Sequence, residues 1–263
     1  MERRRGVNLL GIDTATAASA VCVLRSDGEA FEVEPPPERL VQRPGHAAEL
    51  MPAVVGRLEE SGLDWNDLDA IAVGVGPGMF TGLRIGVATA RGLASSTGLE
   101  LRPVSSLAAL AAGVGGPGVG TPSLALGIGH EGIPTPGSNV GGGTDSGSGE
   151  SVLAVIDARR NEVFAALYAA DGEAVWEPFV AAPAEVAERL GEREVAPLAV
   201  GDGAVRYRDV LTMAGATVPP NDSCTHVVRG LSICRLAASA APVPVEAVLP
   251  DYLRLPDAKP RTA

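Results

Sequence analysis

The sequence predicts an α/β fold, because strands and helices alternate along the chain. An apolar strand over 69–75 runs into a glycine-rich turn, and a helix follows over about 81–96. A second strand over 101–104 leads into a short helix over 106–112. This alternation is typical of α/β architecture. With 46% apolar residues among 263, the chain is long enough for two modest domains or one large one.

The first strands are expected to form a meander ahead of this unit. Small polar residues at 14–19 separate an apolar run over 7–12 from a second one over 20–24. This pattern predicts a β-hairpin whose turn is longer than two residues. A third strand over 30–34 precedes a proline break, and a helix over 46–61 has apolar residues at helical spacing.

The second half begins after a segment of different composition. Gly, Pro, Ser and Thr dominate residues 113–151, and no periodicity crosses them, so we expect a flexible insert there. Apolar runs at 151–156 and 163–168, joined by the polar turn DARRNE, predict a second hairpin. The remaining elements are expected to be a helix over 183–190, a strand over 197–200 and helices over 205–214 and 227–241.

Charge and lysine content argue against several functions. The formal net charge is −11 and the sequence pI is about 4.8, so the isolated chain should repel nucleic acids and anionic membranes unless its twenty arginines cluster. Lys259 is the only lysine, which removes the usual candidates for a Schiff base or a phosphate-clamping ammonium group.

The cysteines and the N-terminus indicate the cell compartment. Cys22, Cys224 and Cys234 are odd in number and lack CxxC spacing, which favours neither a disulfide framework nor a zinc site. The first apolar run is too short for a signal peptide or a membrane span. We therefore expect a cytoplasmic protein that is not exported.

The glycine-rich turn is the most distinctive local feature. Gly74, Gly76 and Gly78 surround Pro77, which predicts a rigid, tight connection that other groups approach closely. Thr81 is a candidate helix N-cap, next to free amides that suit an anion or a partner oxygen. The pattern lacks the lysine of a P-loop and does not match a dinucleotide fingerprint. Gly76 and Gly78 are thus weak ligand candidates, and a turn without a ligand stays open as the alternative.

Two other turns are weak candidates for nucleotide binding. Asp13 ends a strand and is followed by Thr14, which resembles the arrangement that positions phosphate and magnesium-bound water in actin-like and sugar-kinase-like ATPases. Gly201 and Gly203 form a glycine pair of the kind that lets an adenosine approach a strand end. Both turns also have an ordinary explanation, because Asp often caps a turn and GDG is common turn chemistry.

His46 and Glu49 are spaced so that both side chains could face one metal ion at the start of a helix. Two ligands do not make a site, and Leu50 stands where an HxxxH pair would have its second histidine. A capping or interface role for His46 is therefore favoured. The chain also lacks a nucleophile elbow of the GxSxG type, so we predict no metal site and no catalytic residue.

The motifs of both halves, taken together, resemble one family. They are LLGIDTATAASAVCVL at 9–24, HAAELMPAV at 46–54, VGVGPGMFTGLRIGVATARGLA at 73–94, VSSLAALA at 104–111, DARRNEVFAALY at 157–168, VGDGA at 200–204 and PDYLR at 250–254. In order and spacing they resemble the TsaB (YeaZ-like) family, bacterial accessory subunits of the tRNA threonylcarbamoyladenosine machinery. The similarity covers most of the chain outside the insert.

The resemblance implies a two-lobed fold of the actin, sugar kinase and Hsp70 type, with a ribonuclease-H-like sheet in each lobe. The N-terminal lobe would comprise residues 1–103 and carry the partner-binding helices. A smaller C-terminal lobe would comprise residues 104–263 and contain the insert at about 113–151.

The resemblance also implies a non-catalytic dimerisation and activating subunit. Its partner would be TsaD, a paralogue that transfers threonylcarbamoyl to the adenosine next to the anticodon, and the ATPase TsaE would join them. TsaD-like proteins hold their metal with an HxxxH pair, which Leu50 interrupts here, so this chain is expected to be catalytically silent. It would need no cofactor, ATP and Mg²⁺ would act at the level of the complex, and it would not bind tRNA strongly alone.

Members of this family pair through the first two helices, at 46–61 and 81–96 here, which would form a four-helix bundle with two helices of the partner. The expected contact residues are His46, Leu50, Val54, Leu83, Val87 and Ala90. Self-association through the same helices is a further expectation. The alternative is that this apolar stripe faces the sheet of its own lobe.

Two enzymatic alternatives stay open. The chain could be an ATP-binding phosphotransferase or ATPase of the actin-like superfamily, with Asp13 and the turns near Gly76 and Gly201 as its site. A glycoprotease is the weaker alternative, because the metal-ligand pair is missing.

Overall fold

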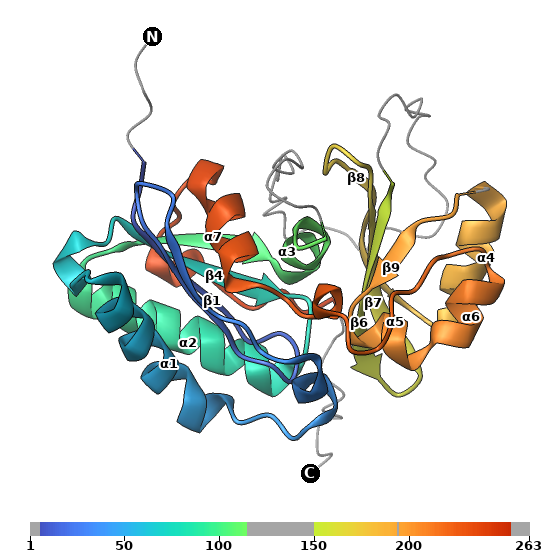
Figure 1. Ribbon diagram of the computed structural model, residues 1–263, viewed down its shortest axis with the longest axis horizontal. Coiled ribbons are helices and arrows are strands. Elements are labelled where there is room, and N and C mark those ends of the chain that lie inside the picture. Colours follow the sequence, from blue (N-terminus) through green and yellow to red (C-terminus); the bar gives the residue numbers. More distant parts are fainter. Residues whose placement is uncertain (1–5, 115–149, 194, 254–263) are drawn as a thin grey trace, which may run out of the picture.

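The computed structural model describes residues 6–114, 150–193 and 195–253, and its strands form two sheets (Figure 1). The first sheet contains β1 (Leu9–Asp13), β2 (Ala20–Leu24), β3 (Ala30–Val33), β4 (Ala70–Gly76) and β5 (Glu100–Ser105). Its order is β3-β2-β1-β4-β5; β1 pairs antiparallel with β2 and parallel with β4.

The second sheet repeats part of this plan with four strands. It contains β6 (Val152–Arg159), β7 (Glu162–Tyr168), β8 (Ala174–Ala181) and β9 (Leu198–Val200), in the order β8-β7-β6-β9. Here β6 pairs antiparallel with β7 and parallel with β9. Each sheet therefore has an antiparallel hairpin and, beside its first strand, a parallel strand.

Two long helices, α1 (His46–Ser61) and α2 (Phe80–Thr97), cover one face of the first sheet (Figure 1). Each ends at a glycine with positive φ, Gly62 at 69° and Gly98 at 76°, which is the usual left-handed helix end. Their apolar stripes join one buried cluster with side chains of β1, β2 and β4. The apolar stripe whose spacing predicts each of these helices is thus the side that covers the sheet.

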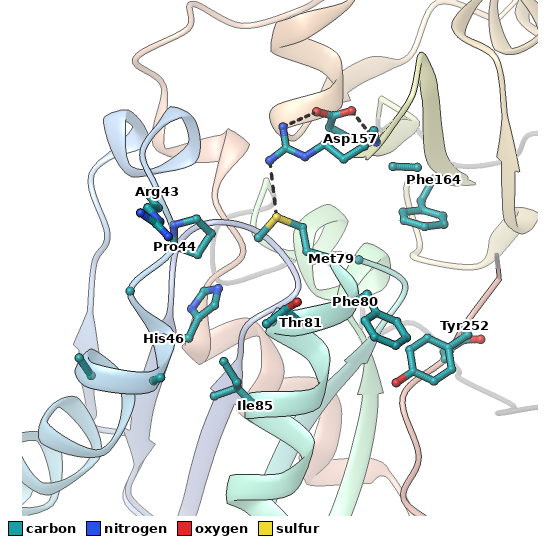
Figure 2. Close-up of a pocket in the computed structure, with 18 residues that line it drawn as sticks. Arg43, Pro44, His46, Met79, Phe80, Thr81, Ile85, Asp157, Phe164 and Tyr252 are labelled. Carbon is teal, nitrogen blue, oxygen red and sulfur yellow. Dashed lines mark hydrogen bonds and ion pairs between the residues drawn. The ribbon is translucent and has the colours of Figure 1, made fainter. Parts of the chain in front are cut away.

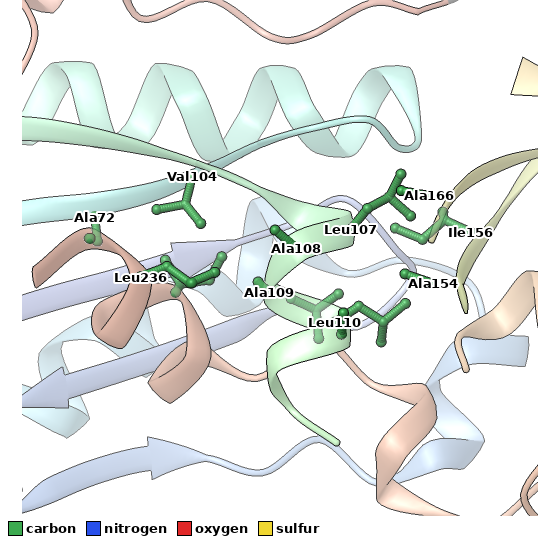
Figure 3. Packing of buried hydrophobic residues seen from close by; sticks show 14 of the residues in the cluster. Ala72, Val104, Leu107, Ala108, Ala109, Leu110, Ala154, Ile156, Ala166 and Leu236 are labelled. Atoms are coloured by element: carbon green, nitrogen blue, oxygen red, sulfur yellow. The ribbon is translucent and has the colours of Figure 1, made fainter. Parts of the chain in front are cut away.

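The opposite face of the first sheet is covered by α7 (Gly230–Ser239) and α3 (Ser106–Ala112). The small helix α3 also lies against the second sheet, where Leu107 and Leu110 pack with Ala154 and Ile156 (Figure 3). Alanines at most other positions of α3 keep this helix thin enough to fit between the two sheets. The main core of the molecule is therefore shared by both sheets.

The outer face of the second sheet carries the remaining helices, α4 (Pro183–Arg193), α5 (Asp202–Arg206) and α6 (Arg208–Met213). Single 3₁₀ turns complete the described elements: η1 (Pro37–Val41), η2 (Trp65–Asp67), η3 (Cys224–His226) and η4 (Val245–Ala247). None of the helices in the described ranges combines the length and the apolar character that crossing a membrane requires.

The α/β class and both hairpins are confirmed, and α1 has the predicted bounds. Other local predictions are wrong. Thr81 is not an N-cap, since α2 starts at Phe80 and Met79 is its N-cap. The helix predicted over 205–214 is interrupted at Tyr207, whose φ and ψ of −113° and 29° are not helical. Strand β8 was not predicted.

The predicted insert lies almost wholly on residues 115–149, outside the described residues, and its flexibility stays a prediction. The lobe boundary near residue 103 also stays a prediction. The C-terminal part of the chain returns to the first sheet, because α7 packs on β1 and β2.

Candidate functional site

Asp13 lies at the end of β1 and is sealed beneath the glycine-rich turn. It is 1% exposed; its Oδ2 accepts a hydrogen bond from Ser106 Oγ at 2.5 Å, and its Oδ1 accepts one from Ala15 N at 2.8 Å. Burial raises the pKa of Asp13 to about 6, although both hydrogen bonds act in the opposite direction. Both carboxylate oxygens are therefore engaged within the chain.

The glycines of the turn and of α2 make room for the loop that follows Asp13. A Cβ at Gly74 would lie 1.8 Å from Asp13 Oδ2, and one at Gly86 would lie 2.2 Å from Thr14 Oγ1. Thr14 Oγ1 donates to the Gly82 carbonyl at 2.8 Å, and a Cβ at Gly82 would lie 2.1 Å from the Thr14 carbonyl oxygen. Close packing of the β1–β2 loop explains this glycine pattern.

Gly76 and Gly78 belong to the same tight region. Gly76 has φ at 111°, a value that side chains rarely tolerate, and a Cβ at Gly78 would lie 2.5 Å from the Ala15 carbonyl oxygen. The structure thus brings the candidates Asp13, Thr14, Gly76 and Gly78 together. They pack against their own chain, and among them only Gly78 lines one of the two described cavities.

Gly201 and Gly203 lie elsewhere, directly after β9 of the second sheet. Gly201 has φ at 110°, and a Cβ there would lie 2.1 Å from the Val155 carbonyl oxygen. The amide of Gly201 donates to Nδ1 of the buried His226 at 3.1 Å. That bond makes Nε2 the protonated nitrogen, which donates to the Pro219 carbonyl at 3.2 Å. These glycines serve close packing against β6.

Two carboxylates near this turn were missed by the sequence reasoning. Asp157, at the end of β6, is buried and forms ion pairs with Arg206 at 2.8 Å and Arg159 at 3.1 Å. Asp202 Oδ1 accepts a hydrogen bond from the Asp157 amide at 3.0 Å, and desolvation raises the pKa of Asp202 to about 6. Both line a cavity of about 620 Å³. The DARRNE and GDG turns, each with one aspartate, were the available signal.

The residues predicted as the partner contact surface face the interior. Exposure is only 0–3% for His46, Leu50, Val54, Leu83, Val87 and Ala90. The set is therefore not an exposed contact surface in this chain. Leu50, Val54, Val87 and Ala90 belong to the buried cluster that covers the first sheet, as the alternative predicts. The physical reason is that the apolar face of the first sheet must be buried, so the apolar stripe of each helix packs on that sheet and is not available to a partner.

The opposite side of the two helices is exposed, and we call it the outer face. It contains Met51 and Val55 on α1, 38% and 42% exposed, and Ala88 on α2. It also contains Gly56 on α1 and Gly92 on α2, where no described atom lies within 4 Å of an added Cβ. The sequence signal was present, because each large apolar residue of this face follows a residue of the buried stripe by one position.

A cavity of about 840 Å³ lies where α1 and α2 begin, and we call it the helix-start cavity (Figure 2). His46 lines it, with Nδ1 2.7 Å from Ser19 Oγ, and burial lowers the pKa of this histidine. Glu49 does not line the cavity and pairs with Arg39 at 2.8 Å. Within the described ranges no group of three or more His, Cys, Asp or Glu residues is placed to hold a metal.

Comparison with known proteins identifies the family. Over 257 residues the chain is 30% identical to the Escherichia coli tRNA threonylcarbamoyladenosine biosynthesis protein TsaB. The match covers 94% of this chain and 95% of that protein. The chain belongs to the TsaB family. An uncharacterized protein of Mycobacterium leprae is 31% identical over 97% of this TsaB-family chain, which spans only 57% of that protein's length.

Solved structures agree with the TsaB assignment. A structure described as an uncharacterized protein with similarity to peptidase YEAZ, from Pseudomonas aeruginosa, matches with a TM-score of 0.68 and 26% identity, over 94% of this chain and 100% of that chain. YeaZ from Pseudomonas aeruginosa matches with a TM-score of 0.64 and 25% identity, over 94% and 99%.

One family model also matches part of this TsaB-family chain. It is TsaD, described as tRNA N6-adenosine threonylcarbamoyltransferase, and it matches residues 39–128. This segment contains α1, α2 and α3, so the matched segment includes both helices of the outer face. In the same segment Leu50, four residues after His46, is 1% exposed and belongs to the buried cluster between the first sheet and the helices that cover it.

Proposed function

We propose that this chain acts in the biosynthesis of threonylcarbamoyladenosine in tRNA, as a non-catalytic dimerisation and activating subunit. The E. coli relative is named for that pathway, which supports a role in threonylcarbamoyladenosine biosynthesis. The partial match to the TsaD family supports a TsaD-type paralogue as the partner. A TsaE-type ATPase would join the two proteins.

The outer face of α1 and α2 is the observation that carries this proposal. A glycine inside a helix costs about 1 kcal/mol relative to alanine. For Gly82 and Gly86 that cost is offset by close packing against Thr14. For Gly56 and Gly92 the described chain offers no such packing. Glycines on an exposed helix face let a second helix approach closely, which supports docking of another protein there.

Exposed apolar side chains on the same face support the proposal further. Met51 and Val55 are large enough that full burial of each would contribute about 1.5–3 kcal/mol. With α1 and α2 from this chain and two helices from the partner, the contact would be a four-helix bundle. Self-association of this chain through the same face is the competing outcome.

The sealed environment of Asp13 and Thr14 supports a non-catalytic role over an actin-like ATPase or phosphotransferase. Both residues are at most 1% exposed and bond within the chain. In this proposal the chain binds no cofactor of its own, and ATP and Mg²⁺ act at the level of the complex. It works in the cytoplasm, without a membrane and without strong tRNA binding alone.

The two sheets support a further proposal, that the architecture is the two-lobed actin, sugar kinase and Hsp70 type. Each sheet begins with an antiparallel hairpin and has a parallel strand beside its first strand. The second sheet has one strand fewer, in keeping with a reduced second lobe.

A pair of tryptophan variants tests the docking face. Gly92→Trp places a bulky side chain on the outer face, while Gly191→Trp places one on α4, where the glycine also faces open space. We expect Gly92→Trp to weaken binding to the TsaD-type partner by about tenfold or more in calorimetry, while circular dichroism shows a folded chain. Gly191→Trp should bind as the unmodified chain does. Equal affinities for both variants would contradict the docking face.

Reconstitution tests the function itself. The TsaD-type and TsaE-type proteins with ATP and the adenylate donor should modify tRNA only when this chain is added. Full activity without the chain would contradict an activating role. Tight ATP binding by the isolated chain that Asp13→Ala abolishes would favour the ATPase alternative.

A further inference from the structure

The helix-start cavity has no role in the proposed docking, yet it is assembled from four separate parts of the chain. The first turns of α1 and α2, the β6–β7 hairpin and residues 251–252 form its wall (Figure 2). Its volume of about 840 Å³ lies within the range of small-molecule sites. The larger apolar residues of its wall are Pro44, Met79, Phe80, Ile85, Phe164 and Tyr252.

Two long helices begin at this cavity without a side-chain cap among the described residues. The N-caps are Gly45 for α1, which has 16 residues, and Met79 for α2, which has 18. The first amides of a helix have no partner inside the helix, and together they carry a partial positive charge. Ala47 and Thr81, in these first turns, line the cavity. The α1 end already has the Glu49 carboxylate beside Gly45, whereas the first turn of α2 contains no acidic residue, so the α2 end in particular favours an anion at this cavity.

His46 adds an independent observation. The residue is 2% exposed and lines the cavity. Its Nε2 has no partner at normal hydrogen-bond geometry among the described residues, while the Thr16 backbone lies near enough to the ring to raise the pKa of His46. When the Ser19 hydroxyl donates to Nδ1, Nε2 carries the proton and is a donor without an acceptor. A buried polar atom left unpaired costs free energy, so an acceptor from a ligand would relieve that cost.

The β6–β7 turn holds an arginine at the same cavity. Arg159, Arg160 and Asn161 have φ values of 64°, 53° and 62°, and consecutive left-handed residues other than glycine are uncommon. In this turn the Arg159 guanidinium reaches Asp157 at 3.1 Å and Met79 Sδ at 3.6 Å. The turn therefore places a cation of the second sheet beside the start of α2.

Arginines pair with one of the two acidic residues of the cavity. Asp157 is paired with both Arg159 and Arg206. Burial raises the pKa of Asp251. Arg43 is a further lining residue with an exposed side chain. The lining charges of Arg43 and Arg159 balance those of Asp157 and Asp251, and Arg206, which pairs with Asp157 from outside the cavity, adds one net positive charge beside it.

We propose that the helix-start cavity binds a small organic anion, whose phosphate or carboxylate group lies between the first turns of α1 and α2. The amides of these turns, His46 Nε2 and the Arg43 guanidinium are its donors. The apolar part of the ligand lies against Phe80 and Tyr252, whose ring centroids are 5.2 Å apart. Charge-assisted hydrogen bonds supply the affinity for the anionic group, and ring contacts supply the preference for an apolar body.

Titration of the ¹⁵N-labelled full chain tests this site. The probes are phenyl phosphate, benzoate, inorganic phosphate and phenol, each at an ionic strength matched with NaCl. We expect phenyl phosphate or benzoate to shift the amide signals of Ala47 and Thr81 in a saturable way, with about tenfold higher affinity than inorganic phosphate. Phenol should shift neither signal. Whichever of the two organic anions binds more tightly identifies the head group.

Three variants separate the two parts of the site. Arg43→Ala should weaken the binding of every anion several-fold. Phe80→Ala should weaken the binding of phenyl phosphate but not that of inorganic phosphate. Arg91→Ala, on α2 but outside the cavity, is the control and should bind as the unmodified chain does. All three side chains are at least partly exposed, so the fold should persist. Unmoved amide signals, or shifts that NaCl alone reproduces, would overturn the proposal.

Discussion

The inner and outer faces of α1 and α2 contain the same kinds of residue in opposite surroundings. On the inner face Leu50 is 1% exposed, and Gly86 lies against Thr14 with no space for a side chain. On the outer face Met51 is 38% exposed, and Gly92 faces open space. An apolar residue or a helix glycine therefore has no fixed meaning in a sequence, because its neighbours decide whether it serves folding or docking.

The largest expected effect separates the two faces at adjacent positions. Leu50→Ala should lower the free energy of unfolding by about 2–5 kcal/mol, because it leaves a cavity in the cover of the first sheet. Met51→Ala should change that free energy by about 0.5 kcal/mol or less and weaken partner binding instead. Urea denaturation and calorimetry measure the two quantities. Similar destabilisation by both variants would show that the faces are not distinct.

The next effect concerns the loop sealed beneath α2. The pKa of Asp13 is about 6 in the folded chain, against 3.8 for an aspartate outside this environment, so between these pH values the folded chain holds a proton that the unfolded chain releases. Its contribution to stability is present below about pH 4 and is lost as the pH rises through 6. As the pH rises from about 4 to above 6, the free energy of unfolding of Asp13→Asn should therefore increase by up to about 3 kcal/mol relative to that of the unmodified chain.

Urea denaturation near pH 4 and near pH 7 measures this difference. Asp209→Asn is the control, because Asp209 lies exposed on α6. If both variants follow the same pH dependence, Asp13 is not the desolvated carboxyl that the structure describes.

A smaller effect is expected for an inner glycine. Gly86→Ala should destabilise the fold by about 1–3 kcal/mol, because its Cβ would lie 2.2 Å from Thr14 Oγ1. The alanine's better helix propensity opposes this by about 1 kcal/mol without reversing it. A rise in the thermal unfolding temperature would contradict the tight contact between α2 and the β1–β2 loop.

The smallest effect has the opposite sign. Gly92→Ala should stabilise the isolated chain by about 0.5–1 kcal/mol, since alanine restricts the unfolded chain and meets no described atom within 4 Å. The same methyl group should weaken partner binding if a helix approaches closely there. Differential scanning calorimetry of the chain, alone and with its partner, measures both changes. A destabilised isolated chain would mean that another segment covers this face.

Local patterns predicted the elements whose boundaries depend on nearby residues. The bounds of α1 follow from its apolar spacing and from Gly62, which adopts the left-handed conformation that ends the helix. Both hairpins follow from short apolar runs separated by polar turns. The candidates Asp13, Thr14, Gly76 and Gly78 lie together in the structure, but their burial depends on contacts that no local pattern shows, and their role as ligand residues stays a prediction.

Features that depend on distant contacts were missed. β8 contains Glu177 and Pro178, and it is a strand because β7 offers it a pairing edge. The choice of face was also missed, since helical periodicity marks an apolar stripe but does not say whether a sheet or a partner covers it. The helix-start cavity joins residues about 200 positions apart, such as His46 and Tyr252, so no local pattern reveals it.

The sequence by itself determined the α/β class, the two hairpins and the long helices of this protein, because backbone geometry and apolar periodicity act over a few residues. Only the tertiary structure decided which side of α1 and α2 is buried, why Gly74 and Gly86 cannot carry side chains, and that His46 and the β6–β7 hairpin line one cavity. Those outcomes depend on excluded volume and solvent exposure, which arise only when distant segments pack together.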